Sequence, residues 1–371
     1  MSQISAYIGL DVHKNSISIA AAPAEHSNPV QFHGRHCADT ARLIKKLAAF
    51  GAPAEVRICY EAGPTGYGLA RALIAAGYDC QVVAPAKTPK LPSDRVKTDR
   101  RDAKKLAEFL RSGHLTAIRI PTEEEEALRD LIRAREDVKH DESDLKRRLM
   151  GLMLRRGRVW NEKSNWTKAH MAWLERAEFD HAATNETKIA YLELIKHLGR
   201  VLAELDRRIE HFALSMQRAD LVRALCAFKG IRVLTAATII SEIGDFDRFP
   251  TAAQFMSFLG LTPSESSSGD STKRGPITKA GNKRLRRLLV ESAWTYKKTP
   301  HESLDLKRRS RGVHPSVKDI AMAAQKRLWR RQMRLLHLNK CSRKVNVAVA
   351  RELAGFLWAA GRSTQLLTQE A

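Results

Sequence analysis

Four acidic residues stand at positions from which their carboxylates could act together on a metal ion. Asp11 closes one short apolar segment and Glu61 closes another. Asp99 and Asp102 are three residues apart, so both lie on one face of a helix. Clustered carboxylates repel one another unless a cation neutralises them, and hard oxygen ligands suit Mg²⁺ or Mn²⁺. A pair of such ions can activate an attacking oxygen and stabilise a leaving one, so phosphodiester cleavage is the predicted chemistry.

Each of the four acids also has a purely structural interpretation. Asp11 could be a turn residue, Glu61 could cap the turn at residues 63–65, and the other two could pair with neighbouring arginines. Single acids are more often structural than catalytic. The order along the chain is a strand-end Asp, a strand-end Glu and a helical Asp-x-x-Asp pair. That order is more specific than any one acid, and it favours a metal site.

A serine-rich stretch at residues 264–268 could supply a second kind of chemistry. Composition alone would make this stretch a flexible linker. It runs, however, into a basic segment at residues 273–286. A hydroxyl beside cations could attack a phosphodiester, with the cations stabilising charge on the phosphate. The loop contains no histidine and Glu265 is its nearest carboxylate, so either this residue or the acid cluster would have to activate the hydroxyl.

The chain carries a large positive charge that is unevenly distributed. Its 371 residues include 64 Lys and Arg against 41 Asp and Glu, a net charge of +23. Residues 271–345 contain 22 Lys and Arg against 4 Asp and Glu, a balance of +18. This asymmetry favours a polyanionic partner, either nucleic acid or an anionic membrane surface. We expect nucleic-acid contacts from Lys273, Arg274, Lys279, Lys283, Arg284, Arg286, Arg287, Arg308, Arg309 and Arg311.

Cysteine usage and hydropathy argue against several classes of protein. The five cysteines are scattered with no Cys-x-x-Cys pair, so neither a zinc site nor a disulfide framework is expected. No segment approaches the roughly 18 unbroken apolar residues of a membrane span, and the N-terminus lacks a secretion signal. We therefore expect a cytoplasmic protein that faces nucleic acid and does not bind a membrane.

The elements that would position the acids alternate between strands and helices. Residues 5–22 have the pattern of a β-hairpin. Further strands are predicted at residues 29–33, 55–60 and 80–84, and helices at residues 39–50, 66–76 and 100–111. Residues 85–97 should form a loop, since they contain three prolines. This alternation predicts an α/β domain over residues 1–115, with a mixed sheet flanked by helices.

A helical connector over residues 116–218 should separate this domain from a second one. Thr122 is placed to cap a helix that ends near residue 156, and a second helix covers residues 188–214. The second helix carries an apolar heptad stripe of Ile195, Leu198, Leu202, Leu205, Ile209 and Phe212. This stripe fits an intramolecular helical hairpin and a dimerising coiled coil equally well.

The C-terminal domain, residues 219–371, should be mainly helical. One Ser- and Gly-rich interruption falls at residues 262–275, and residues 363–371 are expected to fray. Residues 228–243 resemble a helix-hairpin-helix, in which Gly230 would let backbone N–H groups hold a phosphate. A plain helix-turn-helix is the alternative, because one glycine is a weak signal.

Several motifs together resemble the DEDD transposases of insertion sequences, relatives of the Piv DNA invertases. They are IGLDVHK at residues 8–14, YEAGPTGY at residues 60–67 and DRVKTDRRDA at residues 94–103. Residues 263–282 match the C-terminal domain of the same family. The resemblance implies a ribonuclease-H-like N-terminal domain whose metal ligands are Asp11, Glu61, Asp99 and Asp102.

The resemblance also implies a role for the serine-rich stretch and a set of partners. Family members link the serine of a Ser-Gly step covalently to DNA, and the matching residue is Ser268, with Ser266 and Ser267 as neighbouring alternatives. They act as dimers or tetramers that excise and insert a mobile element, guided by a bridge RNA that the element encodes. Two rival functions remain, a junction-resolving nuclease that uses only the four acids and a non-catalytic nucleic-acid-binding relative.

Overall fold

The computed structural model describes residues 3–89, 98–162, 164–268 and 271–369. The chain divides into two compact units, Met1–Pro121 and Thr122–Ala371, and each is described by itself. Of the loop predicted at residues 85–97, only the start is described, as the 3₁₀-helix Pro85–Lys87, and residues 90–97 lie outside the described part. Within the described residues, no helix is both long and apolar enough to cross a membrane.

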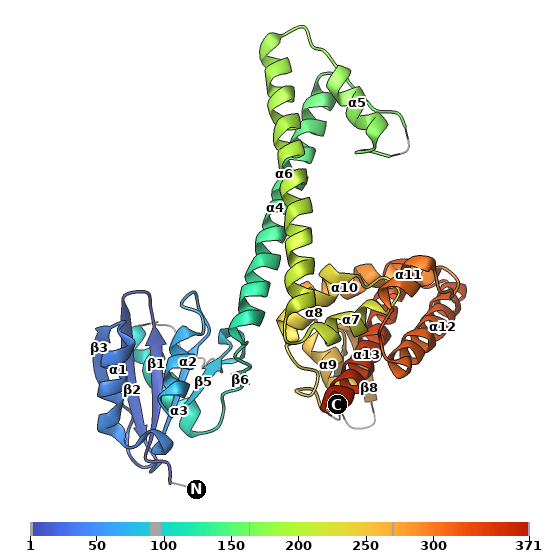
Figure 1. Ribbon diagram of the computed structural model, residues 1–371. Coiled ribbons are helices and arrows are strands. Elements are labelled where there is room, and N and C mark those ends of the chain that lie inside the picture. The colour runs from blue at the N-terminus through green and yellow to red at the C-terminus, as the bar shows by residue number, and fades with distance from the viewer. Residues whose placement is uncertain (1–2, 90–97, 163, 269–270, 370–371) are drawn as a thin grey trace. The chain divides into compact units, whose positions relative to one another are not determined.

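The N-terminal unit contains the mixed sheet that the sequence predicts. Its strands are β1 (Ala6–Val12), β2 (Ser16–Pro23), β3 (Gln31–Cys37), β4 (Val56–Glu61), β5 (Asp79–Val83) and β6 (Ala117–Ile118). Their order in the sheet is β3-β2-β1-β4-β5-β6 (Figure 1). The pairs β1–β4 and β4–β5 are parallel, whereas β1–β2, β2–β3 and β5–β6 are antiparallel. The pair β1–β2 confirms the β-hairpin predicted at residues 5–22. Strand β3 starts later than the strand predicted at residues 29–33, and β6 was not predicted.

Helices cover both faces of this sheet. On one face, α1 (Thr40–Leu47) and α2 (Gly68–Ala75) pack on a core that includes Ile8, Leu10 and Tyr60. On the other, α3 (Asp99–Arg111) packs through its small and leucine side chains on β1, β2 and β4. The 3₁₀-helices Ala48–Phe50 and Pro53–Glu55 follow α1. Asp39 caps α1, because its side chain accepts a hydrogen bond from the Arg42 backbone N–H at 2.9 Å.

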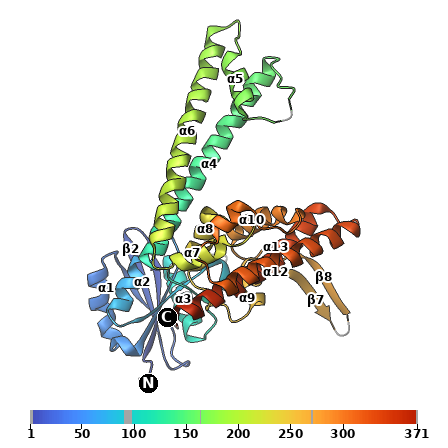
Figure 2. The same cartoon turned by 45° about the vertical axis from the view of Figure 1, so that its right-hand side comes forward.

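The C-terminal unit begins with a long helical hairpin. Helix α4 (Glu123–Arg155) packs along α6 (Ala182–Ser215), and the two lie side by side in both ribbon views (Figures 1 and 2). Thr122 forms a capping box with Glu125, which confirms the predicted start of α4. Ile195, Leu202 and Ile209 are buried, so the intramolecular interpretation of the heptad stripe is confirmed. Phe212 remains half exposed, and pairing with a second copy stays a prediction.

A small separate core lies at the far end of this hairpin. Helix α5 (Lys168–Arg176) packs there against the end of α4 and the start of α6 through a cluster that includes Leu149, Leu174 and Leu192. His170 is fully buried in this region and stacks on Trp173, with a centroid separation of 5.6 Å. The end of the hairpin is therefore held by a cluster of its own rather than by the main core.

The remainder of the C-terminal unit is helical, as predicted. Its helices are α7 (Ala219–Cys226), α8 (Val233–Ile243), α9 (Ala252–Phe258), α10 (Lys283–Ala293), the 3₁₀-helix η4 (Trp294–Lys297), α11 (Leu304–Arg309), α12 (Pro315–His337) and α13 (Ser342–Gln369). They surround a large core that contains Phe228, Phe246 and Phe255. Part of α13 runs through this core, and its Leu353 and Leu357 are fully buried.

The structure confirms the interruption of the helices that was predicted at residues 262–275, and it corrects the prediction for the C-terminal end. The Ser- and Gly-rich interruption is a β-hairpin, formed by β7 (Pro263–Ser268) and β8 (Ser271–Ile277) (Figure 2). The predicted frayed end is helical to Gln369. Its polar side chains find partners, as in the contact of 3.3 Å between the hydroxyls of Ser363 and Ser316, and these contacts stabilise the last turns.

Candidate active site

The ends of two neighbouring parallel strands bring the first two acids to one edge of the sheet. Leu10 of β1 is opposite Tyr60 of β4, so the next residues, Asp11 and Glu61, stand level with each other. Leu10 and Tyr60 both belong to the core under α1 and α2. Since side chains alternate along a strand, the two acids project from the opposite face, which α3 covers. This is the carboxyl edge where open sheets bind ligands.

Helix α3 brings the second pair of acids to the same place. Thr98 caps the helix by accepting a hydrogen bond from the Arg101 N–H at 3.3 Å, and Asp99 and Asp102 lie in the first turn. The positive end of the helix favours acids there. Gly9 lets the helix approach β1, because a Cβ on this residue would lie 2.3 Å from the Ala103 carbonyl oxygen. The glycine of the first motif thus sets the spacing between strand and helix.

Three side chains converge closely enough to share a cation. One ligand atom from each of Asp11, His13 and Asp99 lies within 4.8 Å of the others. His13 Nε2 is 3.2 Å from Asp11 Oδ2 and 3.7 Å from Asp99 Oδ1. Arg35 Nη1 approaches Asp99 Oδ2 at 4.0 Å. Two carboxylates and an imidazole are a donor set that fits a divalent metal ion.

The charge balance of the cluster supports a cation. Burial is the largest effect on Asp11 and raises the pKa of its carboxyl, His13 lowers that pKa, and Asp99 and Asp102 raise it again. Asp102 therefore lies within electrostatic reach of Asp11. Unfavourable burial and like-charge repulsion of this kind are relieved when a cation binds. The cluster suggests a divalent metal, whose identity the geometry does not fix.

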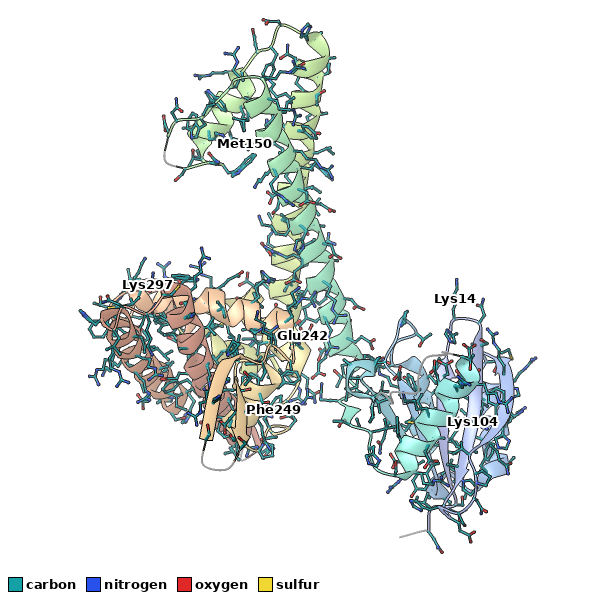
Figure 3. The ribbon with its side chains drawn as sticks, turned by 180° about the vertical axis from the view of Figure 1, so that it is seen from behind. Lys14, Lys104, Met150, Glu242, Phe249 and Lys297 are labelled. Atoms are coloured by element: carbon teal, nitrogen blue, oxygen red, sulfur yellow. The ribbon has the colours of Figure 1, made fainter. Side chains whose placement is uncertain are left out.

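Glu61 and His13 are placed differently from what the sequence implied. Glu61 is not a member of the close group, and its carboxylate accepts a hydrogen bond of 2.8 Å from the Thr88 hydroxyl. His13 lies between β1 and β2, next to Lys14, which Figure 3 labels, and no ligand role was predicted for it. The available signal was its position two residues after Asp11, because alternate residues of an extended strand point to the same face.

The serine-rich stretch presents its hydroxyls from an exposed β-ribbon in the C-terminal unit. Ser268 is the last residue of β7 and pairs with Ser271 of β8. Glu265 accepts a hydrogen bond from the Ser267 hydroxyl at 3.0 Å and lies 3.4 Å from Arg274 Nε. Ser268 projects from the other face of the strand because side chains alternate. Glu265 is therefore positioned to assist Ser267 and not Ser268.

Several of the predicted nucleic-acid contacts have partners inside the C-terminal unit. Arg284 pairs with Glu136 at 2.5 Å and with Glu242 at 3.3 Å, and Arg287 pairs with Glu136 at 2.8 Å. These pairs join α10 to α4 and α8 at the base of the helical hairpin, where Figure 3 labels Glu242. Arg286 donates a hydrogen bond to the Leu259 carbonyl at 2.9 Å.

Arg309 holds the turn between α7 and α8. It donates hydrogen bonds to the carbonyls of Cys226, at 2.8 Å, and of Ile231. Gly230 in this turn has a φ of +83°, which fits the turn of a helix-hairpin-helix and of a plain helix-turn-helix alike, and its binding of a phosphate stays a prediction. The other predicted contacts are exposed side chains, and their binding to nucleic acid also stays a prediction: Lys273, Arg274, Lys279, Lys283, Arg308 and Arg311.

Two family models match the parts of the chain that contain the acid cluster and the serine-rich stretch. A family model described as "Transposase", for DEDD transposases of the IS110 type, matches residues 8–156 and so includes all four acids. A second, described as "Transposase IS116/IS110/IS902 family", matches residues 222–307 and includes Ser268.

Relatives extend the similarity over almost the whole chain. The putative transposase y4qE of Sinorhizobium fredii is 42% identical over 98% of this chain and 90% of its own length. The transposase for insertion sequence element IS1533 of Leptospira borgpetersenii is 31% identical over 88% of this chain and 95% of its own. Matches of this extent show that the chain belongs to the IS110 family of insertion-sequence transposases, enzymes that cut DNA.

Proposed function

We propose that this transposase cuts and rejoins DNA strands at the ends of an insertion element, using two chemical devices. The first is a Mg²⁺ site, with Mn²⁺ as an alternative ion, held by Asp11, Glu61, Asp99 and Asp102, with the His13 imidazole as a further ligand. The second is the hydroxyl of Ser268 as nucleophile. The observation that carries the proposal is the convergence of Asp11 and Asp99, from the end of β1 and the start of α3, on one point within 4.8 Å.

The residues of the N-terminal unit would hold and orient the reacting phosphate group. Bound Mg²⁺ would neutralise the carboxylates and polarise a phosphodiester oxygen. Asp11 is fixed by the sheet and Asp99 by the cap of α3, so neither ligand has to be ordered when the substrate binds. Glu61 is oriented by the Thr88 hydroxyl. Because these groups are already in position, they would stabilise the charge of the transition state without rearrangement of the protein.

Ser268 would conserve the energy of the bond that is broken. Its Oγ attacks phosphorus, the Oγ–P ester forms, and the bond to the departing sugar oxygen breaks. That hydroxyl can later attack the same phosphorus and release the serine, so rejoining needs no external energy source. A hydrolytic nuclease would lose the ester to water. The exposure of Ser268 at the end of β7 supports access by DNA.

The proposal includes three functional segments and two further partners. Residues 1–115 carry the metal site, residues 116–218 form the connector, and residues 219–371 carry the serine and most of the positive charge. We propose a structured guide RNA encoded by the element, and a dimer or tetramer as the active form. The support for both is the resemblance to the DEDD transposases, together with the +18 balance of residues 271–345, which suits either nucleic acid.

The test is to trap the covalent intermediate on a nicked DNA substrate and to look for DNA attached to protein. Wild type should form the adduct, and Ser268→Ala should not, although it still binds DNA. Asp11→Asn should also abolish the adduct, because Asn removes an anionic ligand while keeping the shape of the side chain. An adduct that survives Ser268→Ala and disappears with Ser267→Ala would assign the reaction to the serine next to Glu265. Cleavage without an adduct in any variant would favour the hydrolytic nuclease.

A further inference from the structure

The C-terminal unit contains a large groove that borders the β7–β8 ribbon. Its volume is about 1200 Å³, and residues of α9, β8, α12 and α13 line it. Pockets for small molecules usually enclose about 300–1,000 Å³, so this groove could take a larger, extended ligand. Most of its wall belongs to α12 and α13, which follow the region matched by the second family model at residues 222–307.

The rim of the groove is strongly basic. Among the described residues, its lining contains seven cations and one carboxylate. The carboxylate, Glu352, already lies 3.2 Å from Arg327 Nε and 3.0 Å from Arg331 Nε. The β8 side contributes Arg274 and Lys279, and the first turns of α13 contribute Arg343, Lys344 and Arg351. This excess of positive charge favours an anionic ligand.

The floor of the same groove is apolar. It is formed by side chains of α9 and α13 that pack on the main core, among them Met256, Val347 and Phe356. The Trp358 indole N–H is occupied by a hydrogen bond of 2.9 Å to the Phe249 carbonyl, so this ring offers the groove only apolar surface. Gly355 keeps the floor low, because a Cβ there would lie 2.8 Å from Met256 Cε.

We propose that this groove binds a single-stranded polynucleotide, with its phosphates on the basic rim and unstacked bases on the apolar floor. The inference rests on the proposed contact between the C-terminal unit and nucleic acid, and it extends that contact to α12 and α13. A basic groove combined with an apolar, partly aromatic floor is the pattern of single-strand binding. A duplex has its bases stacked inside and would leave the apolar floor exposed to water.

The position of the groove suggests what the bound strand does. Arg274, Gly275 and Pro276 line it, and all three belong to β8, the partner strand of β7. β7 ends at Ser268. A strand held in the groove therefore runs beside the ribbon that carries the proposed nucleophile. The groove would hold the unpaired flank of the cleaved strand.

The test is binding of fluorescein-labelled oligo-dT, oligo-U and a duplex of equal length to the full chain, measured by anisotropy at several salt concentrations. The groove variant is Arg343→Ala/Lys344→Ala/Arg351→Ala. The matched control is Lys326→Ala/Arg330→Ala/Arg334→Ala, which removes three exposed cations of α12 that do not line the groove. A third variant, Ala348→Trp, fills the groove without changing its charge.

We expect the groove variant to weaken oligo-dT or oligo-U binding at least tenfold and to lower the salt slope by about 2, since single strands give about 0.7 per phosphate neutralised. Ala348→Trp should weaken the same probe, while the control should change affinity less than twofold. Preference for oligo-dT over oligo-U would support the flank of the cleaved DNA strand as the occupant, and the reverse preference would contradict that assignment and indicate RNA. Thermal unfolding of each variant shows that it is folded.

Three results would overturn the proposal. Equal weakening by the groove variant and the control would mean diffuse surface charge, and tighter binding of the duplex than of either single strand would exclude a single-strand site. Unchanged binding by Ala348→Trp, with a loss of self-association in sedimentation, would show that a second copy occupies the groove. Ser268→Ala should bind oligo-dT like wild type, so failure of the serine mechanism and failure of this site are separate outcomes.

Discussion

Replacing Gly9 with alanine tests whether the contact between β1 and α3 sets the geometry of the acid cluster. The new Cβ would lie 2.3 Å from the Ala103 carbonyl oxygen and 2.4 Å from the Ala107 nitrogen. Both are backbone atoms of α3, so no side-chain rotation relieves the overlap. The helix must move away from the strand, and Asp99 in its first turn moves with it.

The size of this movement follows from the distances. Ordinary van der Waals contact begins at 3.4 Å, so α3 has to shift by about 1 Å. Overpacking of this kind costs roughly 1–3 kcal/mol of unfolding free energy. Metal ligands have to stand within about 0.2 Å of their proper distance, so a shift of about 1 Å should remove Asp99 from the coordination sphere. We expect Mn²⁺ binding to weaken at least tenfold, about 1.4 kcal/mol.

The assay is Mn²⁺ titration of the full chain followed by the electron paramagnetic resonance signal of the free ion, together with urea unfolding. The matched control is Gly68→Ala, at the start of α2, where no atom lies within 4 Å of the added Cβ. The control should bind Mn²⁺ like wild type and be no less stable. If Gly9→Ala binds Mn²⁺ with unchanged affinity while unfolding at lower urea, the helix contact supports stability but does not position the acids, and the reasoning fails.

Three further predictions concern other parts of the chain. His13→Ala should weaken Mn²⁺ binding more than Mg²⁺ binding, since imidazole is the softer ligand, and equal losses in calorimetric titration would exclude His13 as a ligand. Arg284→Ala should lower the unfolding free energy by about 2 kcal/mol, because the nearly buried carboxylates of Glu136 and Glu242 each lose one of their cationic hydrogen-bond partners. Arg308→Ala should change stability by less than about 0.5 kcal/mol, and urea unfolding compares the two arginine variants. Burial raises the pKa of Glu142, but hydrogen bonds from two lysines outweigh it and hold that pKa below its ordinary value. The stabilisation is therefore present at neutral pH and lost as pH falls through the folded-state pKa. Glu142→Gln should cost about 1 kcal/mol at pH 7 and nothing near pH 2, and a cost independent of pH in urea unfolding would contradict this.

The sequence could predict that Asp11 and Asp99 meet at one edge of the sheet, because strong local patterns control their positions. Alternating apolar residues define β1 and β4, and each acid follows directly on a buried strand. Parallel pairing then brings Asp11 and Glu61 level. The role of His13 could not be read in the same way, because a histidine at a hairpin turn is ordinary. Only the approach of α3 places its imidazole within 3.7 Å of Asp99.

In the C-terminal unit, local sequence patterns did not predict the β-ribbon or the partners of the arginines. β7 contains none of the β-branched or aromatic residues that are enriched in strands, so the β7–β8 ribbon carries almost no strand signal. The positive charge of a residue in the sequence also does not indicate whether that residue pairs with another group inside the fold. Arg284 and Arg309 look like surface cations in the sequence, but the first pairs with carboxylates of α4 and α8 and the second with backbone carbonyls. Tertiary partners that lie far away in sequence decide which arginines remain available for a ligand.

The separate cluster at the end of the helical hairpin has a consequence for cooperativity. The main core reaches up α4 only to Ile132, and the end cluster begins at Leu149. About 25 Å of the α4–α6 hairpin separates these two positions. Among the described residues of this stretch, Leu202 is the only buried apolar side chain and it belongs to neither cluster, so opening of the end cluster should not propagate into the main core. The unit should behave as two foldons, in which amides of α5 exchange with solvent at a lower free energy than those of α8 or α13.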